Sequence, residues 1–220
     1  MKKVVVTIHG IHWTKQGDWQ NKIGQLIKKE DSLTTVLHFR YGRIFGVFSW
    51  WLSFTRKVGI PSWARHRYIN KFKNFLLRVQ EKFPSAKISV IAHSFGGWIT
   101  EETLKRSDEI NLQNVIFVHC PISSHIESTS FWNWLELEKI KNVFSWSSHK
   151  DFVIGKIAIA PFGQNGYWGF IRNRYVEDRK EPKEQPYPIN LYNIHTEERH
   201  SGVLNKLNTY FDKIWDQLNA

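Results

Sequence analysis

The chain has 220 residues, of which 41% are hydrophobic and 23% charged, a composition that excludes a disordered protein. Lys and Arg number 31 against 20 Asp and Glu, so the net charge of +11 favours anionic partners. The sequence nevertheless lacks zinc-finger spacings, RNP-like aromatic strands and glycine-rich phosphate loops, and we therefore expect no nucleic-acid partner.

The amino-terminal apolar run indicates a strand rather than a targeting segment. Lys2 and Lys3 precede it, but the run covers only 4–8, is β-branched and lacks a small-residue cleavage site. The sequence contains no stretch of about 18 apolar residues, so we expect no membrane-spanning helix. The single cysteine, Cys120, excludes an internal disulfide and a Cys-rich metal site. We expect a cytoplasmic protein.

Strand and helix patterns alternate along the chain. Apolar runs, most of them β-branched, predict strands at 4–8, 35–39, 87–92, 115–118 and 142–146, and an alternating pattern predicts a last strand at 189–194. Apolar residues at helical spacing predict helices at about 19–27, 63–83, 95–105, 130–138 and 203–218. This order predicts an α/β fold, one domain over residues 1–220 with a mostly parallel sheet and helices on both faces.

Ser94 stands between a predicted strand and a predicted helix, in the sequence VIAHSFGG. A nucleophile on such a sharp turn needs small neighbours two residues away on either side. Ala92 and Gly96 occupy these positions, and Gly97 gives the helix further room. The motif is an alanine variant of G-x-S-x-G, and it favours Ser94 as a nucleophile over a mere glycine-rich helix start.

A base and an acid follow at later strand ends. His200 lies in the loop between the last strand and the final helix, whereas His195 is still at the strand end, so we favour His200 as the base. Asp151 lies in the loop after the 142–146 strand and is the preferred acid, with Glu127 as the fallback. The order Ser94, Asp151, His200 is the one expected for this topology.

Two backbone amides are candidates for stabilising an oxyanion. The N–H of Phe95 follows the nucleophile, and the N–H of Ile11 follows the turn that Gly10 allows after the first strand. Cys120 could be taken for a second nucleophile, but it lacks the strand–turn–helix setting and is better interpreted as a small buried residue. No His/Asp/Glu cluster has the spacing of metal ligands, and we expect neither metal nor cofactor.

The sequence resembles the α/β-hydrolase superfamily, and within it the small lipase and esterase branch. The segments that carry the resemblance are VVVTIHGI, VIAHSFGG, SSHKD and HSGVL. The resemblance implies a triad of Ser94, Asp151 and His200, with Ile11 and Phe95 supplying the oxyanion-hole amides. Two features depart from the family pattern: Ala92 replaces the more usual glycine, and 152–188 matches no family motif.

An aromatic segment at about 42–62 bears on the substrate. Its apolar part, RIFGVFSWWLSFTRK, admits three interpretations: a core-facing segment, a wall or lid over an acyl pocket, or a contact with an anionic membrane surface. The last two favour an ester with an apolar acyl part. Candidate pocket or lid residues are His12, Phe45, Phe48, Trp50 and Trp51.

The sequence therefore predicts a serine hydrolase that cleaves carboxylic esters through an acyl-enzyme. Thioesterase, amidase or acyltransferase activity would use the same constellation. A non-catalytic module bound to a membrane surface is the alternative from a different class. The sequence leaves the acyl acceptor and the oligomeric state open.

Overall fold

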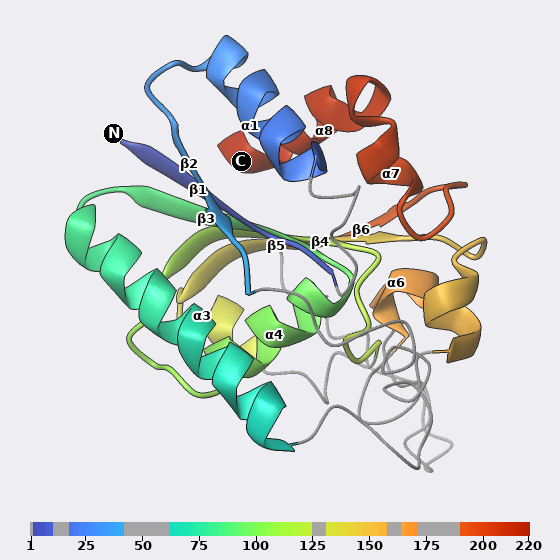
Figure 1. Ribbon diagram of the computed structural model, residues 1–220, viewed down its shortest axis with the longest axis horizontal. Helices are drawn as coiled ribbons and strands as arrows, with labels where there is room; N and C mark the ends of the chain where they lie inside the picture. The colour runs from blue at the N-terminus through green and yellow to red at the C-terminus, as the bar shows by residue number, and fades with distance from the viewer. Residues whose placement is uncertain (1, 11–17, 42–61, 125–130, 158–163, 171–189) are drawn as a thin grey trace, which may run out of the picture.

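The structure, a computed structural model, describes residues 2–10, 18–41, 62–124, 131–157, 164–170 and 190–220 (Figure 1). The described strands form one six-stranded sheet in the order β2-β1-β3-β4-β5-β6, and every neighbouring pair is parallel. The strands are β1 (Lys3–Ile8), β2 (Thr35–Phe39), β3 (Lys87–His93), β4 (Leu112–Val118), β5 (Ile140–Ser147) and β6 (Leu191–His195). The predicted parallel sheet is confirmed.

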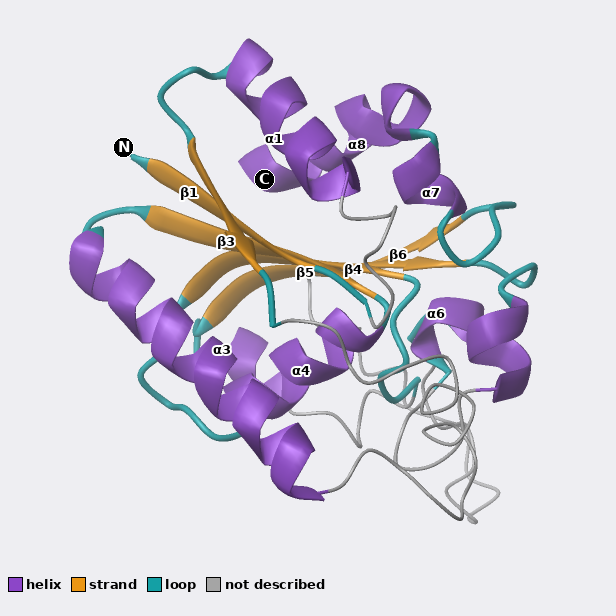
Figure 2. Ribbon diagram, in the orientation of Figure 1, coloured by secondary structure: helices purple, strands orange, loops and turns teal. Residues whose placement is uncertain are grey.

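Helices cover both faces of this sheet, as predicted (Figure 2). One face carries α1 (Asp18–Glu30), α7 (Gly202–Asn205) and α8 (Leu207–Asn219). The other carries α3 (Ser62–Lys82), α4 (Phe95–Leu104), α5 (Phe131–Glu136) and α6 (Asn165–Trp168). A short π-helix, η2 (Val153–Ile157), follows β5.

Burial on both faces explains the continuous β-branched strands. Side chains of a strand alternate between the two faces, so Val4 and Val6 of β1 pack in the core under α3 and α4, while Val5 packs in the core under α1 and α8. Ile27 of α1 and Ile214 of α8 belong to the second core and are fully buried. A polar residue on either face of this strand would therefore need a buried partner.

Strands β4 and β5 begin two or three residues before their predicted starts. Asn114 interrupts the apolar pattern ahead of the predicted start of β4, and Asn142 is the predicted first residue of β5, yet both are buried. Asn142 Nδ2 donates to Asn114 Oδ1 at 2.8 Å, and Asn114 Nδ2 donates to the Gln217 carbonyl of α8 at 2.8 Å. Mutual hydrogen bonding satisfies these amides, so the strands continue where hydropathy alone would end them.

The final helix is divided, whereas the sequence predicted it as continuous. Helix α7 ends before Lys206, whose backbone leaves helical angles (φ −106°, ψ 40°), and α8 begins at Leu207. The Lys206 ammonium donates to Glu198 Oε1 at 2.9 Å, which ties the break to the loop before α7. Val203, Leu204 and Leu207 are buried on both sides of the break, so the apolar stripe itself was predicted correctly.

Candidate active site

Ser94 occupies a strained turn between β3 and α4. Its backbone has φ 52° and ψ −128°, a conformation that L-residues rarely adopt. Its neighbours must be small: a Cβ on Gly96 would lie 2.6 Å from the His9 carbonyl oxygen, and a Cβ on Gly10 would lie 2.8 Å from the Ser94 Cβ. The end of β1 approaches the turn closely, which explains why glycine occupies both position 96, after Ser94, and position 10, after β1.

Three side chains from separate strand ends form one hydrogen-bonded chain. Ser94 follows β3, Asp151 lies in the loop after β5 and His200 lies in the loop after β6. The Ser94 hydroxyl donates to His200 Nε2 at 2.8 Å, and His200 Nδ1–H donates to Asp151 Oδ2 at 2.8 Å. The structure therefore brings together the three residues that the sequence nominates as nucleophile, base and acid.

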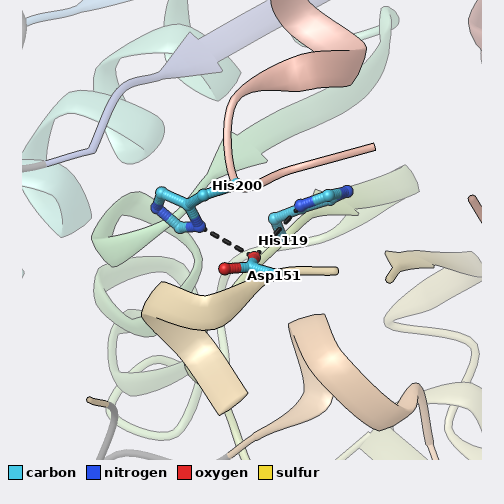
Figure 3. A group of neighbouring side chains, drawn as sticks. All are labelled: His119, Asp151 and His200. Atoms are coloured by element: carbon cyan, nitrogen blue, oxygen red, sulfur yellow. Dashed lines mark hydrogen bonds and ion pairs between the residues drawn. The ribbon is translucent and has the colours of Figure 1, made fainter. Parts of the chain in front are cut away.

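The carboxylate of Asp151 is buried and accepts three hydrogen bonds. Oδ2 accepts from His200 and also from His119 Nδ1 at 3.1 Å (Figure 3). Oδ1 accepts from the Ile154 amide at 3.0 Å. Burial alone would raise the pKa of this carboxyl, but the hydrogen bonds from His119 and His200 outweigh burial and hold it well below its usual value. Asp151 is therefore ionised.

His93, directly before Ser94, supports the loop that carries His200. Its Nε2–H donates to the His200 carbonyl oxygen at 3.1 Å, and the two rings lie 5.1 Å apart. Burial, followed by the proximity of His200, lowers the pKa of His93 well below its ordinary value. A neutral His93 is suited to hold the His200 backbone without adding a second positive charge.

The far side of the His200 loop is fixed by Glu198. Its Oε1 accepts hydrogen bonds from the Lys206 ammonium at 2.9 Å and the Tyr210 hydroxyl at 2.8 Å. A Cβ on Gly202 would lie 2.5 Å from Glu198 Oε2, so this glycine lets the loop pack closely against α7. The break between the two final helices thus helps to position the loop that carries His200.

The two competing candidates, His195 and Cys120, make their hydrogen bonds to other groups. His195 Nδ1 forms a hydrogen bond with the Ser147 hydroxyl at 2.9 Å, and not with Ser94 or Asp151. Cys120 is fully buried, and its thiol donates to the Ala92 carbonyl near the turn that carries Ser94. Burial raises the pKa of this thiol strongly, so Cys120 is better interpreted as a packing residue than as a nucleophile.

Several predicted site residues cannot be placed. Phe95 is described: it opens α4 directly after Ser94, where the amide predicted for the oxyanion hole stands. The other amide donor, the fallback acid and the pocket or lid candidates lie outside the described residues; they are Ile11, Glu127, His12, Phe45, Phe48, Trp50 and Trp51.

Two histidines of this site were not predicted as site residues. His93 directly follows the predicted strand at 87–92 and His119 directly follows the predicted strand at 115–118, and neither was assigned a role from the sequence. The available signal was position, because a polar residue at the carboxyl end of a strand beside that of Ser94 must face the same edge of the sheet.

A His–Asp–His group also meets the elementary requirement of a metal site. One ligand atom each from His119, Asp151 and His200 lies within 4.8 Å of the others. Sequence spacing did not reveal this group because its members come from three different strand ends. Both histidine Nδ1 atoms already donate to the same carboxylate oxygen, so a cation bound there would displace the two hydrogen bonds that Asp151 accepts from His119 and His200.

Comparison with known proteins shows the fold but no family by sequence. No protein-family model matches the sequence, and no curated protein matches it. In the part of the chain that the structure describes, no helix is both long and apolar enough to cross a membrane.

Solved structures that resemble the chain over nearly its whole length include α/β hydrolases. A proposed hydrolase of the alpha/beta superfamily from Xanthomonas campestris matches with a TM-score of 0.54 and 8% identity, over 97% of this chain and 98% of that one. A structure from a study of Nitrososphaera gargenis carboxylesterases matches with a TM-score of 0.54 and 12% identity, over 99% and 90%. The Francisella virulence factor BioJ matches with 0.53 and 14%, over 99% and 76%. The chain has the α/β-hydrolase fold.

Proposed function

We propose that the protein is a serine hydrolase that cleaves carboxylic esters through an acyl-enzyme intermediate. The observation that carries the proposal is the pair of 2.8 Å hydrogen bonds that joins Ser94 Oγ to His200 and His200 to Asp151. A serine hydroxyl needs a base within this reach, and the base needs an acid that fixes its tautomer. The strained backbone of Ser94 adds support, because strain of this kind gathers at functional sites.

The proposed reaction proceeds in two halves. Ser94 Oγ attacks the ester carbonyl carbon while its proton passes to His200 Nε2, and the negative charge on the carbonyl oxygen is met by the Phe95 and Ile11 amides. The C–O bond then breaks, and His200 returns the proton to the departing alcohol. Water, deprotonated by His200, hydrolyses the acyl-enzyme and regenerates the Ser94 hydroxyl. Throughout, Asp151 stays ionised and stabilises the His200 imidazolium.

The proposed substrate is a small-molecule ester with an apolar acyl part. The support is the aromatic segment 43–57, whose apolar residues suit an acyl pocket or a lid. Basic residues flank that segment, and a peripheral contact with an anionic membrane would be compatible with the same activity. Thioesters, amides and acyl transfer are the neighbouring reactions against which the ester should be compared.

Labelling by a fluorophosphonate tests the proposal directly. Wild type should become covalently modified at Ser94 and should turn over short and long p-nitrophenyl esters, whereas Ser94→Ala should do neither. Ser89→Ala is a matched control, because Ser89 lies buried on β3, the strand that precedes Ser94, and its replacement should leave labelling intact. Ester turnover that survives in Ser94→Ala would refute the mechanism, and a protein that only bound membranes would not be labelled at all.

The choice of base has its own test. His200→Asn removes the acceptor of the Ser94 proton and should reduce labelling about as far as Ser94→Ala does, since triad members act as a unit. His195→Asn alters a histidine that contacts Ser147 and should keep most of the activity. The opposite ranking of these two variants would show that the base is His195.

A further inference from the structure

We propose that His119 is a positioning residue, whose Nδ1–H holds the Asp151 carboxylate in the orientation that His200 requires. The inference rests on the proposed function, since it gives His119 a role in the same reaction. His119 stands at the end of β4, the strand between that of Ser94 and that of Asp151 in the sheet. Four adjacent strands, β3 to β6, therefore each place one group at the site.

The contact between His119 and Asp151 is buried and has a defined polarity. Both side chains are fully buried, and His119 Nδ1 lies 3.1 Å from Asp151 Oδ2, the oxygen that also accepts from His200 (Figure 3). Figure 3 shows the two imidazoles approaching this carboxylate from different sides. An ionised carboxylate only accepts, so His119 must carry its proton on Nδ1. Its Nε2 is buried with no hydrogen-bond partner in the structure, which agrees with that tautomer.

The backbone of His119 resembles that of Ser94. Its φ is 51°, beside 52° for Ser94, and each residue directly follows its strand. The Ser94 amide donates to the Val118 carbonyl of β4 at 3.1 Å, and the His119 amide donates to the Trp146 carbonyl of β5 at 3.0 Å. The same construction thus occurs on two neighbouring strands, and such strain persists only where the surroundings fix it.

Gly166 of α6 packs closely against the backbone of His119 and Cys120. A Cβ on Gly166 would lie 2.6 Å from the His119 carbonyl carbon and 2.7 Å from the Cys120 nitrogen. The Gly166 amide also donates to the Cys120 carbonyl at 2.9 Å. Helix α6 therefore fixes the turn after β4 at the place where the imidazole reaches Asp151.

The groups that face His200 define what the loss of His119 would change. They are Ser94, Asp151, His93 and His119 itself. A donor on Oδ2 draws negative charge away from the bond to His200 and prevents the carboxylate from rotating. Without it, Asp151 would hold a proton on His200 more tightly, and less of the base would be available at low pH.

Two substitutions separate the hydrogen bond from the packing. His119→Phe fills the ring volume without a donor, whereas His119→Asn places an amide N–H near the position of Nδ1 and tolerates positive φ. With a fluorophosphonate probe, His119→Phe should lower the labelling rate constant of Ser94 about 10- to 100-fold, by analogy with the loss of residues that orient metal ligands. The acidic limb of its pH profile should move to higher pH. His119→Asn should retain most of the rate and the wild-type midpoint.

The outcomes distinguish the inference from the function on which it rests. No labelling of wild type refutes the proposed function, whereas wild-type labelling with an unchanged rate and midpoint in His119→Phe refutes the inference alone. Equal losses in both variants would also overturn it, because the restored donor would then have no effect. Nitrogen NMR of wild type supplies a readout that needs no variant: it should show His119 protonated on Nδ1, and a proton on Nε2 instead would exclude the hydrogen bond to Asp151.

Discussion

Replacing the acid, Asp151→Asn, should cost about three orders of magnitude in activity. The carboxylate accepts three N–H groups, whereas an amide has one accepting oxygen and an NH₂ that donates. If the amide oxygen faces His200, the imidazolium loses a carboxylate at hydrogen-bond distance, an interaction of about 4 kcal/mol or about a thousandfold in rate. If the NH₂ faces His200 instead, His200 takes the other tautomer and can no longer accept the Ser94 proton, with a loss of about 10⁴-fold.

The assay combines kcat/KM for a p-nitrophenyl ester with the rate of fluorophosphonate labelling, in wild type and Asp151→Asn. Asp108→Asn is the matched control, because Asp108 is 94% exposed, pairs only with Lys139 among described residues and should leave both quantities unchanged. Urea denaturation should show that Asp151→Asn folds, with stability reduced by about 1.5–3 kcal/mol for the buried donor left unpaired. A folded Asp151→Asn within tenfold of wild-type activity would refute the assignment of Asp151 as the acid.

Three further predictions concern the turn that carries Ser94 and the carboxyl of Asp151. Gly96→Ala should destabilise the protein by about 1–3 kcal/mol and abolish labelling of the nucleophile, because its Cβ would press on the His9 carbonyl; urea denaturation and labelling measure this. Gly97→Ala should be destabilising because its Cβ would overlap the Cys120 thiol, and Cys120→Gly in the same chain should restore part of the loss; additive effects would contradict this contact. The Asp151 carboxyl has a lowered pKa in the folded state, so its stabilisation is complete above the unfolded value of about 3.9 and is lost as pH falls towards the lower folded value; urea denaturation between pH 5 and 2 should show a shallower loss in Asp151→Asn.

The sequence predicted the elements of the fold well because both faces of the sheet are buried. The run 4–8 is β-branched throughout and apolar except for Thr7, and this pattern indicates a parallel strand without reference to its neighbours. The errors lie where tertiary contacts outweigh local pattern. Buried Asn114 pairs with Asn142 from the adjacent strand, and Lys206 bonds to Glu198 across the loop, and neither pairing can be inferred from a single segment.

The candidate site was predictable in part, for a reason of topology. Parallel strands direct all of their carboxyl ends to one edge, so Ser94, Asp151 and His200 could be nominated one by one as loop residues after strands. The distances between them could not, because these depend on the lateral strand order β3-β4-β5-β6. His119 was missed for the same reason: its proposed role depends on Asp151, which follows the adjacent strand β5. Nothing in the local segment VHCP indicates that a carboxylate lies beside it.

The three donors on Asp151 bear on where the proton rests during the proposed reaction. A carboxylate that accepts from His119, His200 and the Ile154 amide has a reduced affinity for a proton, and its pKa is accordingly lowered. The His200 imidazolium therefore keeps its Nδ1 proton instead of passing it to Asp151, and it stays positively charged. The proton taken from Ser94 is held on Nε2, where it faces the Ser94 oxygen and the alcohol that must leave. A buried carboxylate with fewer donors would compete for the Nδ1 proton, so the hydrogen bonds that orient Asp151 also keep His200 effective as the acid that protonates the leaving alcohol.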